Sequence, residues 1–220
     1  MNKRLVSFSL WGDQTFYTDG AVYNAEAMPL VYPGWIARYY HDDSVPTPVL
    51  EKLKSFDHVE LARMQETTGA LAMFWRFHPM FDDNNVERFI VRDTDSTVGD
   101  REAAAVDEWI ESGKSFHIIR DCESHNIPIL GGTWGAIRGC IPLFEERMFA
   151  FLGNVLPVAE NPRGPYHGQD QLFLSDVVWP HIRNDHTAHI RAGVPKLRFT
   201  PSDVELPAWA EGDRYVGMVG

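Results

Sequence analysis

Asp93 and Asp95 are the residues whose types and spacing most directly indicate chemistry. They follow an apolar, β-forming run at residues 89–92, and alternate residues of an extended chain point to the same side. Two neighbouring carboxylates repel each other unless a cation or a basic side chain lies between them, and Mg²⁺ and Mn²⁺ accept such oxygen ligands. Asp-Thr-Asp-Ser is also typical of a solvated turn. A metal site and a plain turn are therefore the two interpretations of this pair.

Alternating strand and helix patterns surround the pair and predict the framework that positions it. Hydrophobic periodicity predicts strands at residues 5–10, 35–40, 58–64, 86–92 and 115–119, and residues 127–130 form a further short apolar run. Helices are predicted at residues 18–28, 46–56, 67–75, 100–112, 142–152 and 169–179, with Pro29, Gly113 and Pro180 as stops. This order predicts an α/β fold with a mostly parallel central sheet flanked by helices, and ligands at the carboxyl ends of the strands. The acidic pair falls at such an end.

Two other stretches have less regular patterns. Residues 161–168 are rich in proline and glycine and predict an irregular loop, and residues 131–135 form a glycine-tryptophan loop. The segment from residue 184 onward has no clear periodicity, so no structure is predicted for it.

Composition restricts the classes of function. The 220 residues are 44% hydrophobic and 23% charged, which is ordinary for a single globular domain. Twenty Lys and Arg against 31 Asp and Glu give a net charge of −11, the wrong sign for a surface that binds nucleic acid or an anionic membrane. A local basic pocket for one diphosphate stays compatible with that charge.

The cysteine content and the first residues of the chain indicate the expected cellular compartment. Cys122 and Cys140 are the only cysteines, so neither a disulfide framework nor a cysteine zinc site is indicated. The start of the chain is basic, but its apolar run is too short for a signal peptide, and no run reaches the roughly 18 apolar residues of a transmembrane helix. We expect a soluble, cytoplasmic protein without a signal peptide.

Several stretches, taken in order, resemble the small GT-A glycosyltransferases with an Asp-x-Asp motif, a family that includes a chlorovirus capsid-glycan enzyme. They cover most of the chain between residues 32 and 179, and the series is more specific than an Asp-x-Asp alone. The resembling stretches are residues 32–35, 38–46, 73–77, 92–96, 101–102, 117–121, His125, 131–135 and 170–174.

The resemblance implies a single GT-A-like, Rossmann-like domain over residues 1–220 and a hexosyltransferase-type activity. A sugar would move from a nucleotide-diphosphate donor, a UDP-sugar, to a glycan or another hydroxyl acceptor. Residues 1–96 would form the nucleotide-sugar-binding half and residues 97–220 the acceptor-binding half. The implied donor-binding residues are Phe8, Ser9, Leu10, Arg38, Arg92, Asp93 and Thr94.

The resemblance also implies a Mn²⁺ or Mg²⁺ cofactor on Asp93 and Asp95, held against the donor diphosphate. Asp95 is the expected direct ligand, and Asp93 reaches the cation through water or binds the ribose. His186 could complete the metal site from the tail. Arg92 either pairs with the acidic site or forms an ordinary salt bridge.

The expected acceptor-binding residues are Gly132, Trp134 and His125. Trp134, like Trp11, suits stacking on a flat ring, although tryptophan is also a common core residue. His125 either binds a sugar hydroxyl or phosphate or is structural. Asp170 is the expected general base of an inverting reaction; in a retaining reaction it would orient hydroxyls, and its other interpretation is a helix N-cap.

Two other classes of protein fit parts of the pattern. The sequence at 93–97 matches the first motif of haloacid-dehalogenase-type phosphatases, in which Asp93 would attack phosphorus. That motif should follow the first strand, whereas three predicted strands precede it here. A non-catalytic sugar-binding module would account for the seven tryptophans and would bind glycans without a nucleotide.

Overall fold

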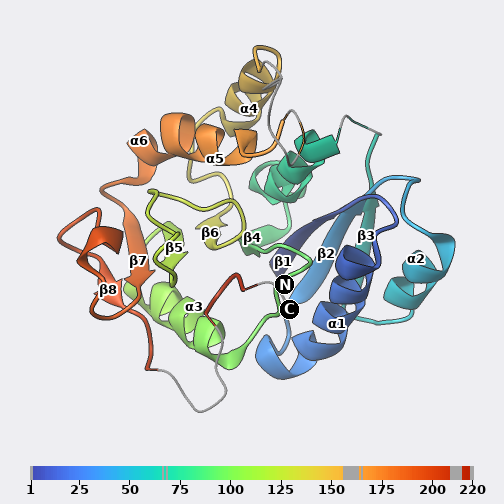
Figure 1. The fold of residues 1–220 in the computed structure, drawn as a ribbon, viewed down its shortest axis with the longest axis horizontal. Helices are drawn as coiled ribbons and strands as arrows, with labels where there is room; N and C mark the ends of the chain where they lie inside the picture. The colour runs from blue at the N-terminus through green and yellow to red at the C-terminus, as the bar shows by residue number, and fades with distance from the viewer. Residues whose placement is uncertain are drawn as a thin grey trace.

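An eight-stranded sheet in the order β3-β2-β1-β4-β6-β5-β7-β8 forms the centre of the fold (Figure 1). The computed structural model describes residues 2–65, 67, 69–155, 164, 166–208 and 215–218. Neighbouring strands are parallel except where β6 pairs with β4 and with β5. The strands are β1 (Lys3–Leu10), β2 (Ile36–His41), β3 (Val59–Arg63), β4 (Val86–Val91), β5 (Phe116–Arg120), β6 (Trp134–Ile137), β7 (His186–Ile190) and β8 (Val204–Glu205).

Helices cover both faces of the sheet (Figure 1). They are α1 (Thr15–Val31), α2 (Thr47–Lys54), η1 (Gly69–Met80), α3 (Asp100–Ser112), α4 (Phe144–Leu152), α5 (Gln169–Phe173), η2 (Leu174–Val178), α6 (Trp179–Ile182) and η3 (Pro195–Leu197). Within the described part of the chain, every helix is too short or too polar to span a bilayer.

The alternation of side chains along the strands creates two separate cores. Phe8 and Ile90 face α1 and α3, where they pack with Trp109. Leu5 and Phe89 face the opposite side, which is covered by η1, α4 and the α5–α6 region. Both strands are buried on both faces towards their carboxyl ends, and the apolar residues gathered there, such as Phe89–Val91 in β4, made the two strands predictable.

The predicted α/β architecture with a mostly parallel sheet is confirmed. Predicted and observed elements agree closely for β1, β2, β3, β4, α2, α3, β5 and α4. The helix predicted at residues 67–75 is a 3₁₀ helix that extends to Met80, and part of the predicted loop at residues 161–168 lies outside the described residues.

Three predictions of extent and type are wrong. Pro29 does not end the first helix, because it lies inside α1, which continues to Val31. The predicted glycine-tryptophan loop ends in a strand: Trp134–Ile137 form β6, inserted antiparallel between β4 and β5, whereas the apolar run at residues 127–130 forms no strand. Glycine and tryptophan favour a loop locally, but pairing with two neighbours outweighs that preference. Pro180 does not end the helix that starts at Gln169, because it lies in the first turn of α6 after the π-helical turn η2, where a missing N–H is tolerated.

Candidate functional site

A cavity of about 460 Å³ opens at the carboxyl ends of β1 and β4. This is the edge at which ligands bind in open α/β sheets. Its lining comes from the β1–α1 connection, η1, the segment after β4, the loop before β6, α5 and the C-terminal segment. The lining residues are Ser9, Trp11, Phe16, Tyr17, Met73, Arg76, Asp93, Thr94, Asp95, His125, Leu130, Gly131, Gly132, Thr133, His167, Asp170, Gln171 and Gly217.

The segment after β4 delivers the two predicted carboxylates into this cavity. Ser96 N–H donates to Asp93 O at 3.3 Å, so the chain turns directly after the strand. Partial burial and the negative charge of Asp93 raise the pKa of Asp95 to about 6. A positive charge placed beside this carboxyl group would stabilise its ionised form.

Arg76 lies between two acids. One arm of its guanidinium forms an ion pair with Asp93, and the other donates to Asp170 Oδ2 at 2.9 Å. Burial opposes the charge on Arg76, but Asp93 and Asp170 outweigh it and raise the pKa of the guanidinium. The planar two-armed group of arginine suits this bridge, which lysine cannot reproduce.

Strand β1 fixes the backbone of Arg76 through two serines. Ser7 Oγ donates to Arg76 O at 2.7 Å, and Arg76 N–H donates to Ser9 Oγ at 3.0 Å. These hydroxyls explain why polar residues alternate on one face of a buried strand. Sequence reasoning gave Arg76 no role, although an arginine in the apolar segment 69–80 signals a buried partner.

Asp170 enters the cavity from the start of α5. Gly168 takes the left-handed conformation before it, with φ of 85°, and aims the first turn of the helix at Arg76. The side chain is 3% exposed, and burial raises its pKa. Its second oxygen, Oδ1, is buried and has no hydrogen-bond partner among the described residues, so its capacity to accept a hydrogen bond is unused.

Two glycines bring the loop before β6 against the acids. A Cβ at Gly132 would overlap the Asp93 carboxylate, and one at Gly131 would overlap Asp170 Oδ2. The glycines are therefore needed for close approach.

Aromatic rings form another part of the cavity wall. Trp11 stacks on Tyr17 with ring centroids 6.5 Å apart, and Phe16 and Tyr17 are 44% and 37% exposed. His125 contacts Tyr215 edge-to-face at 5.9 Å. Exposed aromatic faces suit flat rings such as a nucleobase or a sugar.

The structure brings seven of the predicted site residues together and places six elsewhere. Those at the cavity are Ser9, Thr94, Asp93, Asp95, His125, Gly132 and Asp170. Those outside its lining are Phe8, Leu10, Arg38, Arg92, Trp134 and His186.

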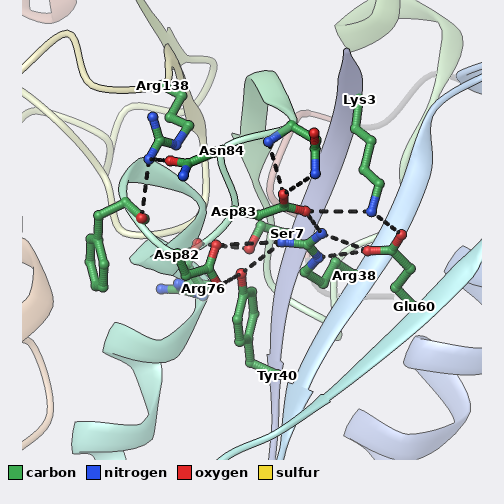
Figure 2. A network of polar contacts seen from close by, with 12 residues as sticks. Lys3, Ser7, Arg38, Tyr40, Glu60, Arg76, Asp82, Asp83, Asn84 and Arg138 are labelled. Carbon is green, nitrogen blue, oxygen red and sulfur yellow. Dashed lines mark hydrogen bonds and ion pairs between the residues drawn. The ribbon is translucent and has the colours of Figure 1, made fainter. Parts of the chain in front are cut away.

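Arg38 belongs to a separate polar network on β1, β2 and β3 (Figure 2). Its Nη2 donates to Glu60 at 2.6 Å and to Asp83 at 2.7 Å, and Lys3 contacts the same two acids. These contacts satisfy its charge within the protein. They explain why Arg38 does not extend to the cavity, where a nucleotide contact was expected.

The other residues outside the cavity are buried. Phe8 and Leu10 are core residues. Arg92 pairs with Glu102 at 3.0 Å, the ordinary salt bridge that was its alternative interpretation. Trp134 has no exposed surface and stacks on Phe116 at 5.1 Å, so the acceptor stacking expected of it is not available.

His186 lies on β7, 3.5 Å from the carboxylate of Asp203. It is buried and does not line the cavity. The structure therefore separates it from Asp93 and Asp95, with which it was expected to share a metal.

Comparison with known proteins extends this description at the level of the fold. No family model matches the sequence, and no curated protein is significantly similar to it. Among solved structures, a protein from Desulfovibrio desulfuricans G20, described as a nucleotide-diphospho-sugar transferase, aligns with a TM-score of 0.50 and 10% identity over 86% of this chain and 80% of that one. The chain therefore has the fold of nucleotide-diphospho-sugar transferases.

Two further structures align with TM-scores of 0.49. One is a glycosyltransferase involved in glycosylation of the major capsid of PBCV-1, 13% identical over 86% of this chain and 81% of that one. The other is 4-diphosphocytidyl-2C-methyl-D-erythritol synthase from Anaerococcus prevotii DSM 20548, 10% identical over 86% of each chain.

Proposed function

We propose that this protein is a metal-dependent glycosyltransferase that moves a sugar from a nucleotide-diphosphate donor, a UDP-sugar, to a hydroxyl group of a glycan acceptor. The observation that carries the proposal is the convergence of Asp93, Asp95, Asp170 and Arg76 in one cavity at the carboxyl edge of the sheet. The fold supports the class of donor. Residues 1–96 supply the acidic pair and the aromatic wall, and residues 97–220 supply Asp170 and the glycine loop.

The residues present fit a Mg²⁺ or Mn²⁺ ion that is shared with a diphosphate. Among the described residues, no three His, Cys, Asp or Glu side chains are placed to hold a metal alone. Mg²⁺ is commonly held by one or two carboxylates together with substrate phosphates, and Asp93 and Asp95 both line the cavity. When bound, the cation supplies charge neutralisation for the diphosphate leaving group.

Asp170 and Arg76 are the groups of this chain that act nearest the acceptor. The free Oδ1 of Asp170 can accept a proton or a hydrogen bond from a hydroxyl group, and its raised pKa strengthens it as a base. Arg76 holds Oδ2, and its positive charge opposes the rise in the pKa of Asp170 that burial causes. In an inverting transferase Asp170 is the general base; in a retaining one it orients hydroxyls. The anomeric configuration of the product distinguishes these roles.

Nucleotide binding tests the proposal. We expect UDP with Mn²⁺ to raise the thermal midpoint, and Asp95→Asn to abolish that shift while the unliganded midpoint stays near the wild-type value. The matched control is Asp43→Asn, which removes an exposed acid that pairs with Arg63 away from the cavity. No shift with UDP, GDP or CMP in the presence of Mn²⁺ would contradict the proposal, as would normal binding by Asp95→Asn.

The same screen separates the competing classes. A phosphatase of the haloacid-dehalogenase type needs a free nucleophilic Asp93, but here Asp93 follows the fourth strand and Arg76 holds one of its oxygens. Phosphate release with a covalent intermediate on Asp93 would favour that class. Glycan binding that needs neither nucleotide nor metal would favour a sugar-binding module. We place the reaction in the cytoplasm because cysteine usage favours a reducing compartment.

A further inference from the structure

Helix α1 holds the segment that carries the acidic pair through one buried side chain, Asn24. Its amide nitrogen donates to Thr94 O at 3.1 Å and to Ser96 O at 3.0 Å. Its amide oxygen accepts from Val98 N–H at 3.0 Å. Asn24 is 0% exposed, so all of these groups would lose their partners, without replacement by bulk water, if the amide were removed.

Gly20 provides a second contact, one turn earlier on the same helix. A Cβ at this position would overlap Thr94 O and approach Asp95 Cα at 3.4 Å. The helix backbone therefore packs directly against the segment between the two acids. Gly20 sets the separation of helix and segment, and Asn24 fixes their register.

Asp95 depends on this contact for its position. Among the described residues, no side chain donates a hydrogen bond to its carboxylate and none forms an ion pair with it, whereas Asp93 is held by Arg76. The direction in which Asp95 enters the cavity is thus set by its backbone. The hydrogen bonds of Asn24 lie on the two carbonyls that flank it.

We propose that Asn24 is a positioning residue for the cation and diphosphate site, acting through the backbone of residues 94–98. This inference rests on the proposed function, because it makes Asn24 responsible for the position of the Asp95 carboxylate, which would bind the cation. It also links two walls of the cavity. Phe16 and Tyr17, at the start of α1, belong to the same helix as Asn24.

Calorimetry on the full chain tests this role. We expect Asn24→Ala to raise the apparent Kd for Mn²⁺ in the presence of UDP at least tenfold, and to leave the affinity for metal-free UDP within about twofold. Met28→Ala is the matched control, because Met28 is equally buried on α1 but faces the sheet core. It should lower the thermal midpoint while the Mn²⁺ affinity stays within about twofold of wild type.

A second variant and a second measurement distinguish a loss of positioning from a failure to fold. Asn24→Asp keeps the acceptor for Val98 N–H and loses both donors, so it should also weaken Mn²⁺ binding if Asn24→Ala does not fold. Amide hydrogen exchange of the metal-free protein should show faster exchange at Val98 in Asn24→Ala than in Met28→Ala. Wild-type Mn²⁺ affinity in both Asn24 variants, or an equal loss in Met28→Ala, would overturn the positioning role alone.

Failure of the wild-type protein to bind UDP with Mn²⁺ is a different result. It would overturn the proposed function, and with it the link from Asn24 to a cation. The exchange rate at Val98 would then still decide whether Asn24 holds the segment. Unchanged exchange in Asn24→Ala would remove that part of the inference as well.

Discussion

Asp170 has one oxygen that is held and one that is free, and this asymmetry defines what the residue can do. Arg76 binds Oδ2, so the proton-accepting position is Oδ1. We predict that Asp170→Asn leaves binding of UDP and Mn²⁺ near the wild-type level and slows sugar transfer by about 10²-fold or more, the usual contribution of a general base. Initial rates at saturating donor measure this. Wild-type turnover in the variant would reduce Asp170 to a structural partner of Arg76.

Arg76 is a buried cation whose partners are both acids, so its removal affects stability as well as the site. Arg76→Met leaves the buried Asp170 carboxylate without its counter-charge, and we expect the free energy of unfolding to fall by about 3–5 kcal/mol. Denaturant unfolding of Arg76→Met, Asp170→Asn and the double variant forms a cycle. The double variant should lose less than the two single losses combined; additive losses would show that the pair is not coupled.

At the scale of elements, the site depends on a close approach between the loop before β6 and the segment after β4. Gly132→Ala would place a methyl group against the Asp93 carboxylate, so one of the two segments must move. We predict at least tenfold weaker binding of UDP with Mn²⁺, measured by calorimetry. Gly99→Ala is the control, because a Cβ there meets nothing within 4 Å. Equal affinities for the two variants would contradict the role of the close approach.

Elements with strong periodicity were predictable, and those defined by their partners were not. Strand β4 ends in the buried apolar run Phe89–Val91, β1 alternates buried apolar residues with two serines, and α3 has an apolar stripe with Gly113 as its stop. Strand β6 has only four residues and exists because β4 and β5 pair with it on both sides. Strands β7 and β8 extend the sheet in a segment for which no structure was predicted. Long-range pairing carries no local signal.

In the context of the whole molecule, the site residues also divide into those with a local sequence signal and those whose roles depend on distant partners. Asp93, Asp95 and Asp170 were predictable as cavity residues because strand ends and helix starts collect at one edge of a parallel sheet. Arg76, Asn24 and Gly20 were not, because their roles are defined by partners up to 94 residues away. Arg38 and Trp134 suit ligand binding by type, but neither lines the cavity: Arg38 is paired with Glu60 and Asp83, and Trp134 is buried in the core.

The stability of the whole molecule should depend on pH through a buried histidine pair that joins β5 to β7. His117 Nε2 lies 2.9 Å from His189 Nδ1, and His189 Nε2 lies 2.9 Å from Glu108. Burial lowers the pKa of both histidines; the charge of Glu108 opposes this at His189, whereas His189 and Arg92 add to it at His117. The unfolded chain therefore binds more protons than the folded one below about pH 6.5.

Stability contributed by the neutral pair is complete above that pH and is lost as the pH falls towards the lowered pKa values of the folded state. Each histidine can contribute up to about 1.4 kcal/mol per pH unit to the slope of unfolding free energy. We predict that the double variant His117→Gln, His189→Gln has a shallower slope between pH 6.5 and 5 in urea unfolding. His181→Gln, at an exposed histidine, should leave the pair and the steep slope intact. Equal slopes for the wild type and the double variant would mean that this histidine pair does not contribute to the pH dependence of stability, and that acid instability arises elsewhere in the molecule.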